Sequence, residues 1–361
     1  MTDAVNSAPK AASNSTTATM RRVLAGLWPT RWPAEWAPVG TLLVMVAFFA
    51  LTTPGFLQPG TLRLVLQQGA VLAIVAAGLT FVLLCGEIDL SVGTVALWTA
   101  CACGVLFEQP FAAGPGGDGA APAWAVAAVI LVPLASALGI GWLSGMLTVK
   151  SGLPSFIITL AMMNIADGLA RWITNSEKFA VPDLLKWIGN RRVVLPGGLG
   201  LPWAVFLAAA VLLISYLVLT YTRFGRYVYM TGGNREAARL AGVRTSRIIV
   251  ACLAICGLTA GLGGLVNAGR LESVTLDQNA DLLLSAVACV VLGGTSLFGG
   301  VGGIGRTILG VLTFSVLQVG LNGLILHLQW DDRIRPFLMG LVLLGALLLN
   351  GTFATRSGRS T

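Results

Sequence analysis

The stretch GEIDLSVG, residues 86–93, lies between two apolar runs, residues 64–85 and 94–107. It places two carboxylates, Glu87 and Asp89, where the flanking sequence is typical of a membrane span. An ionisable group at bilayer depth costs about 2.5–3.5 kcal/mol on insertion scales, so it indicates a functional site. Non-helical backbone survives in a membrane only where protein or a cavity covers it. The stretch therefore predicts either a functional break between two spans or a polar loop that surfaces between them.

The composition is that of a membrane protein. Of the 361 residues, 56% are hydrophobic and 11% are charged, whereas a soluble domain carries about 25% charged residues. The 45 glycines suit close helix packing in lipid, and the pairs Gly141/Gly145 and Gly257/Gly261 have the i, i+4 spacing of packing faces. We interpret the formal charge of +8 as the excess of basic residues that orients a membrane protein and attracts anionic lipid. No nucleic-acid partner is expected.

Ten apolar stretches predict an all-α polytopic membrane protein, with some spans short or broken because a crossing helix needs about 20 apolar residues. Ten spans put both termini on one side, and 14 of the 23 Lys and Arg lie there against 8 on the other side. This excess predicts cytoplasmic termini. We expect a disordered cytoplasmic tail over 1–35, a transmembrane domain over 36–352 and a C-terminal cytoplasmic tail over 353–361. The stretches are 38–54, 64–85, 90–107, 123–148, 153–174, 202–221, 248–268, 280–297, 303–327 and 334–350.

The sequence offers no catalytic constellation, metal site or cofactor site. The six cysteines lie in apolar segments, where Cys behaves as a small hydrophobe, so disulfides are not expected. One histidine, His327, is too few for a hydrolase built on several His ligands. No lysine completes a Walker A loop. The pattern Gly300-x-Gly302-x-x-Gly305 lies between apolar spans rather than in a βαβ unit, so we interpret it as a tight, packed turn.

Residues 222–247 form a strongly basic internal loop, with six arginines and one acid, Glu236. Asn234 is a good helix N-cap, and Glu236 then falls in the first turn, where the macrodipole favours an acid. The two alanines that follow are strong helix formers with little bulk, and a glycine ends the pattern. We predict a short, slim helix that fits a groove on another protein, with a solvated basic loop as the alternative. Its residues are Gly233, Asn234, Glu236, Ala237, Ala238 and Gly242.

Two motifs together resemble those of a known family. GEIDLSVG resembles the signature of inner-membrane permease subunits of ATP-binding cassette importers for simple sugars, and Glu-Ala-Ala-x₃-Gly over 236–242 fits the pattern of bacterial importer permeases. The resemblance covers about residues 40–350. The more common signature has Gly at the position of Glu87, whereas xylose-type permeases carry Glu there, which favours a pentose. The signature positions are Gly86, Glu87, Asp89, Ser91 and Gly93.

The resemblance implies the partners and the site. It implies a homodimer in the bacterial inner membrane that imports a monosaccharide from periplasm to cytoplasm. Two separate ATPase subunits would bind ATP and Mg and grip the predicted short helix of each copy. A periplasmic sugar-binding protein would deliver the cargo and set most of the selectivity. The chain itself would be a transport subunit and not an enzyme.

Polar side chains in two predicted spans are candidates for the translocation path. Asn164, Asp167 and Arg171 share one helical face, and Asp167 can pair with Arg171 at i, i+4. Gln318 and Asn322 form a second stripe, and their amides suit an uncharged sugar. The alternative is that these groups join helices, at about 0.6 kcal/mol per hydrogen bond.

Other interpretations stay open at this point. The cargo could be autoinducer-2, a nucleoside or another small polar solute. The chain could be a proton-coupled secondary transporter that uses Glu87, Asp89 or Asp167 as a relay. Asp89 could also simply fix its loop at a helix N-terminus. The outer loop over 175–201 could hold a short helix, dock a partner or be a plain connector, and residues 291–296 weakly repeat the end of the 64–85 run.

Overall fold

The computed structural model describes residues 36–109, 122–194, 200–279 and 281–345, and each of the ten predicted spans contains a helix there. The last of these helices covers 335–345, the limit of the described residues. The predicted tails, 1–35 and 353–361, lie outside the described residues. The longer helices are α2 (Ala37–Thr52), α3 (Pro59–Leu84), α4 (Val92–Phe107), α5 (Ala123–Ser151), α6 (Ser155–Thr174), α8 (Trp203–Tyr221), α11 (Thr245–Leu271), α12 (Leu282–Leu292) and α13 (Ile304–His327).

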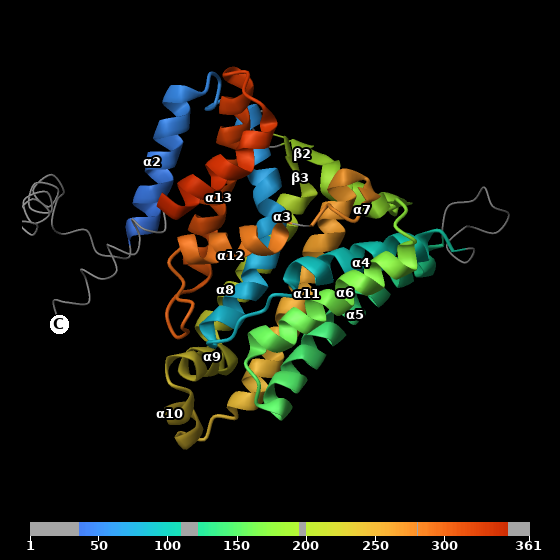
Figure 1. Ribbon diagram of the computed structural model, residues 1–361, viewed down its shortest axis with the longest axis vertical. Coiled ribbons are helices and arrows are strands. Elements are labelled where there is room, and N and C mark those ends of the chain that lie inside the picture. The colour runs from blue at the N-terminus through green and yellow to red at the C-terminus, as the bar shows by residue number, and fades with distance from the viewer. Residues whose placement is uncertain (1–35, 110–121, 195–199, 280, 346–361) are drawn as a thin grey trace, which may run out of the picture.

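The apolar helices divide into inner and outer ones. Six helices among the described residues are long and apolar enough to cross a membrane, and three shorter apolar helices accompany them. α3 and α11 are buried on most sides, whereas α5, α6 and α8 expose much of their apolar surface. An apolar helix buried all round belongs to the protein interior, and an exposed apolar face suits lipid. Figure 1 shows α4, α5 and α6 side by side on one flank, and α2 with α13 on the other.

Glycines set the contact between α5 and α11. A Cβ atom added at Gly141 would lie 2.3 Å from the carbonyl oxygen of Leu253, and one at Gly257 would lie 2.4 Å from that of Ala137. Only glycine lets two helix backbones approach so closely. The predicted packing faces are therefore confirmed, and they hold α5 against the central α11.

The two ends of the helix bundle carry different short elements. One end carries α9 (Arg223–Gly233) and α10 (Arg235–Leu240), and we call it the α10 end. The other carries α7 (Asp183–Asn190) and two small antiparallel sheets, and we call it the α7 end (Figure 1). The strands are β1 (Phe179–Ala180) with β4 (Ser273–Val274), and β2 (Arg192–Val194) with β3 (Gly200–Pro202).

The predicted outer loop, 175–201, is anchored to the end of α11. It contains α7, so the short-helix interpretation of this loop is confirmed. The side-chain amide of Asn190 donates to the carbonyl oxygen of Gly269 at 3.2 Å. The rings of Trp187 and Trp203 stack with centroids 5.0 Å apart. The first contact holds α7 against the last turn of α11, and the second holds it against the start of α8.

We predict that Gly141→Ala lowers the free energy of unfolding by about 1–3 kcal/mol, because the added methyl group overpacks the contact with α11. The matched control is Gly139→Ala in the same helix, where a Cβ atom meets nothing within 4 Å. Thermal unfolding of the two purified variants in one detergent measures the difference. Equal unfolding temperatures of the Gly141→Ala and Gly139→Ala proteins would contradict the prediction, because they would mean that α5 and α11 can move apart at no cost.

Candidate functional site

The signature stretch, residues 86–93, leaves α3 by a tight turn. Gly86 has a φ of +80°, a region that glycine enters without steric cost. The backbone N–H groups of Gly86 and Glu87 donate to the carbonyl oxygens of Leu83 and Val82, at 3.0 and 3.1 Å. This is the hydrogen-bond pattern of a glycine helix end, and it satisfies two carbonyls that the helix leaves free.

Asp89 is fixed inside this stretch. Its side chain is buried, and Oδ1 accepts hydrogen bonds from the backbone N–H of Ser91 at 2.9 Å and from its hydroxyl at 2.6 Å. Gly93, in the first turn of α4, packs against the segment before α12. Glu87, Asp89 and Ser91 are buried and Gly86 is exposed, so the stretch is a shaped turn between α3 and α4 whose two acids lie inside the protein.

The predicted short helix forms at the α10 end. The Asn234 side chain accepts from the N–H of Ala237 at 2.9 Å, and Glu236 lies in the first turn. Gly242, with a φ of +81°, ends the helix in a Schellman motif. Ala238 is buried, whereas Leu240 is 83% exposed. Gly233 closes the preceding α9. The helix is thus the small, protruding element that the pattern predicted, and its coupling role stays a prediction.

The signature stretch and the α10 segment are in direct contact. Nη1 of Arg235 lies 3.2 Å from Oε1 of Glu87, whose side chain is 9% exposed. Behind this pair, a Cβ atom at Gly232 would lie 1.8 Å from the carbonyl oxygen of Leu84. That same oxygen accepts a hydrogen bond from the N–H of Gly300 at 2.9 Å. Three motifs that are far apart in the sequence therefore meet at one place.

The weak internal repeat has a counterpart in this geometry. α12 closes through Gly294 and Thr295, whose N–H groups donate to the carbonyls three and five residues earlier, as at the end of α3. The loop that follows α12 then supplies Gly300 to the contact with Leu84. The two similar sequence patterns form similar helix ends, and the loop that follows the second one contacts the first.

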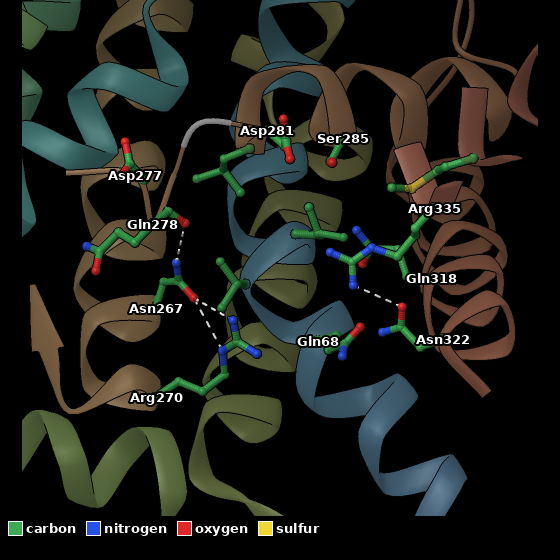
Figure 2. Close-up of a pocket in the computed structure, with 14 residues that line it drawn as sticks. Gln68, Asn267, Arg270, Asp277, Gln278, Asp281, Ser285, Gln318, Asn322 and Arg335 are labelled. Carbon is green, nitrogen blue, oxygen red and sulfur yellow. Dashed lines mark hydrogen bonds between the residues drawn. The ribbon is translucent and has the colours of Figure 1, made fainter. Parts of the chain in front are cut away.

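A polar cavity of about 310 Å³ lies nearer the α7 end. Its walls come from α3, α11, α12, α13 and the helix over 335–345 (Figure 2). Two guanidinium groups and two carboxylates face it, so their formal charges balance. Amides and a hydroxyl supply the remaining polar groups. The polar lining residues are Gln68, Asn267, Arg270, Asp277, Gln278, Asp281, Ser285, Gln318, Asn322 and Arg335.

Each arginine of the cavity is held by an amide oxygen. Nε and Nη2 of Arg270 donate to Oδ1 of Asn267, at 3.2 and 2.9 Å. Nη1 of Arg335 donates to Oδ1 of Asn322 at 3.0 Å. Figure 2 shows these two pairs on opposite sides of the cavity, with Gln68 between them. The arrangement holds donors and acceptors at fixed positions on facing walls.

The structure distributes the predicted path residues over different places. Gln318 and Asn322 both line the polar cavity. Asp167 pairs with Arg171 at 2.8 Å, as the spacing predicted, and both line a second cavity of about 150 Å³ between α4, α6 and α12. The amide of Asn164 donates to the carbonyl oxygen of Leu160 in its own helix, at 2.9 Å. Asn164 lines neither cavity, and its part in a path stays a prediction.

Most of the cavity's polar residues are absent from the sequence prediction. Gln68, Asn267 and Arg270 each interrupt or end an apolar run, and this interruption is the signal that could have found them. Their convergence depends on which helices are neighbours, and no local pattern carries that. Among the described residues, no group of three or more His, Cys, Asp or Glu side chains is arranged to hold a metal ion.

Comparison with known proteins gives consistent matches. The family model described as branched-chain amino acid transport system / permease component matches residues 61–349. The ribose import permease protein RbsC of Escherichia coli (strain K12) is 36% identical over 299 residues, covering 81% of this chain and 87% of the relative. The probable ABC transporter permease protein YphD of the same strain is 31% identical over 327 residues, 88% and 91% of the two chains. The fructose import permease protein FrcC of Rhizobium meliloti is 29% identical over 325 residues, 88% and 85%. No solved structure matches the chain significantly.

We predict that Asp89→Ala lowers the initial rate of solute uptake about tenfold, because two charge-assisted hydrogen bonds that shape the signature stretch are lost. Uptake by cells and the amount of permease in their membranes are measured together. Asp89→Asn, which keeps a side-chain oxygen able to accept both hydrogen bonds from Ser91, is the matched variant and is expected to keep more of the uptake. A fully active Asp89→Ala protein would mean that the stretch is only a connector.

Proposed function

This chain belongs to the family of branched-chain amino acid transport system / permease components, and we propose that it carries a monosaccharide across the bacterial inner membrane. Like its relatives, it is a transport component and not an enzyme. In the proposed function it is the membrane subunit of an ATP-binding cassette importer that moves a pentose, such as xylose or ribose, from periplasm to cytoplasm. The names of the ribose and fructose relatives support a simple sugar.

The observation that carries this proposal is the charge-balanced polar cavity. Ligand pockets measure about 300–1,000 Å³, so a cavity of about 310 Å³ is suited to a small molecule. A sugar hydroxyl accepts from a guanidinium or amide N–H and donates to a carboxylate or amide oxygen. Two arginines and two aspartates leave no net formal charge that would favour an ion. An uncharged, polyhydroxylated solute fits this set of groups better than a solute with a net charge, such as a nucleotide.

The proposed path runs from the polar cavity toward the α10 end. Gln318 and Asn322 are its first contacts, and Asp167 lies beside it in the smaller cavity. Asp277 lines both cavities, which supports a connection between them. Asn164 stays a proposed path residue because it shares one face of α6 with Asp167.

The proposed energy source is a pair of separate ATPase subunits that hold ATP and Mg. The support is the protruding helix α10. Its start is capped, its Leu240 is exposed, and arginines lie at its first residue and in its last turn. We propose that each copy of a homodimer inserts α10 into one ATPase. The α10 end, and with it both chain termini, is then cytoplasmic. The α7 end receives a periplasmic sugar-binding protein.

We predict that Gln318→Leu and Asn322→Leu each lower uptake of radiolabelled D-xylose or D-ribose about tenfold. Each change replaces a hydrogen-bonding amide with an apolar side chain in a site that must hold hydroxyl groups. Gln109→Leu, at the exposed end of α4, is the amide control. Unlabelled D-fructose, adenosine and L-leucine are tested as competitors. Competition by leucine or adenosine alone, or full activity of both cavity variants, would contradict the proposal.

A further inference from the structure

Glu87 is a buried acid whose partner belongs to a distant segment. Its carboxylate pairs with Arg235, the first residue of α10, across 148 positions of sequence. The arginine side chain is 51% exposed, so the pair lies at the boundary between protein interior and surroundings. A buried carboxylate is costly unless it is paired, and this requirement ties Glu87 to the position of α10.

The same stretch is attached to α6 on its other side. The N–H of Ile88 donates to the hydroxyl of Ser155 at 2.9 Å, and the N–H of Leu90 donates to the hydroxyl of Thr159 at 3.1 Å. Both hydroxyls lie in the first turns of α6. Asp89, between these two attachment points, is fixed by Ser91. The stretch is therefore a short, stiff bridge between α10 and α6.

The close contact between the backbones of Gly232 and Leu84 acts in one direction only. The close approach of Gly232 to the carbonyl oxygen of Leu84 resists any movement of α9 toward α3. Steric contact transmits a push, whereas a pull requires an attractive interaction. The hydrogen bond from Gly300 to Leu84 is attractive and joins α3 to the loop after α12. The hydroxyl of Tyr229 in α9 donates to the carbonyl oxygen of Gly302 in that loop at 3.1 Å, so these two bonds hold α9 but involve no residue of α10. The ion pair is the attraction that joins α10 itself to the signature stretch.

We propose that the Glu87–Arg235 pair makes the signature stretch, and α6 with it, follow α10 in both directions of its movement. The inference rests on the proposed function, in which an ATPase moves α10. Because α6 also carries Asp167 at the smaller cavity, the bridge reaches the proposed path. Glu87 and Arg235 are thus positioning residues for the coupling of hydrolysis to transport, and neither contacts the cargo.

The test measures ATP hydrolysis and D-ribose transport by the permease–ATPase complex in proteoliposomes, with its binding protein present. Glu87→Gln removes one charge and keeps the side chain's shape, and Arg235→Gln removes the opposite charge and leaves a shorter polar side chain. We expect the complex to assemble and to hydrolyse ATP within about twofold of the original rate, while the sugar moved per ATP falls about tenfold. A merely structural role would lower both rates together and leave their ratio unchanged, which would overturn the inference.

A double variant separates a pair from two independent residues. If the two side chains act as one link, Glu87→Gln with Arg235→Gln loses no more coupling than either single change. Losses that multiply to about a hundredfold would contradict the pair. Arg333→Gln is the control, because Arg333 also neighbours an acid, Asp331 at 3.8 Å, but is exposed and lines neither cavity. If the unchanged complex shows no ATP-dependent uptake, the proposed function fails; if it transports and the variants keep its ratio, only this inference fails.

Discussion

The carbonyl oxygen of Leu84 is the point at which the loops of the α10 end are joined. A carbonyl at a helix end inside a membrane protein must find a partner, since no bulk water is available to it. Here the partner is the N–H of Gly300, and the backbone at Gly232 lies so close that a Cβ atom there would be 1.8 Å from the same oxygen. Helix ends from the first, middle and last parts of the chain are therefore locked together. A movement of α9 toward α3 would therefore press on Leu84 and on the loop bonded to it, and in the proposed function this is how a displacement of α10 is passed on.

Two continuous helices connect this junction with the polar cavity. α3 carries Gln68 in the cavity and Leu84 at the junction, and α11 carries Asn267 in the cavity and begins just after α10. Both helices are buried along most of their length, and α11 is held against α5 by backbone contact at glycines. Packed interiors shift between discrete arrangements rather than deforming gradually. A displacement at the α10 end is therefore expected to reach the walls of the cavity, although no residue at the junction lies near the cargo.

The parts of this account that the sequence could predict are local. The cap at Asn234, the glycine end at Gly242 and the Asp167–Arg171 pair each depend on residues within one helix or its ends, and the structure confirms each geometry. The glycine faces of α5 and α11 were also readable from spacing. The Glu87–Arg235 pair and the lining of the cavity could not be predicted, because they depend on which spans are neighbours. All apolar helices present similar sequences to lipid and to one another, so periodicity does not choose between partners.

In the proposed function this chain is a passive gate, moved from the α10 end by ATPase subunits that it does not contain. The most direct measurement is sugar accumulation in proteoliposomes that hold the purified permease with and without those subunits. We predict that the concentration of labelled D-ribose or D-xylose inside the vesicles rises above the external concentration only when the ATPase subunits, the binding protein and ATP are all present. Sustained accumulation by the permease alone, driven by a proton gradient, would contradict it and would make the buried carboxylates a proton relay.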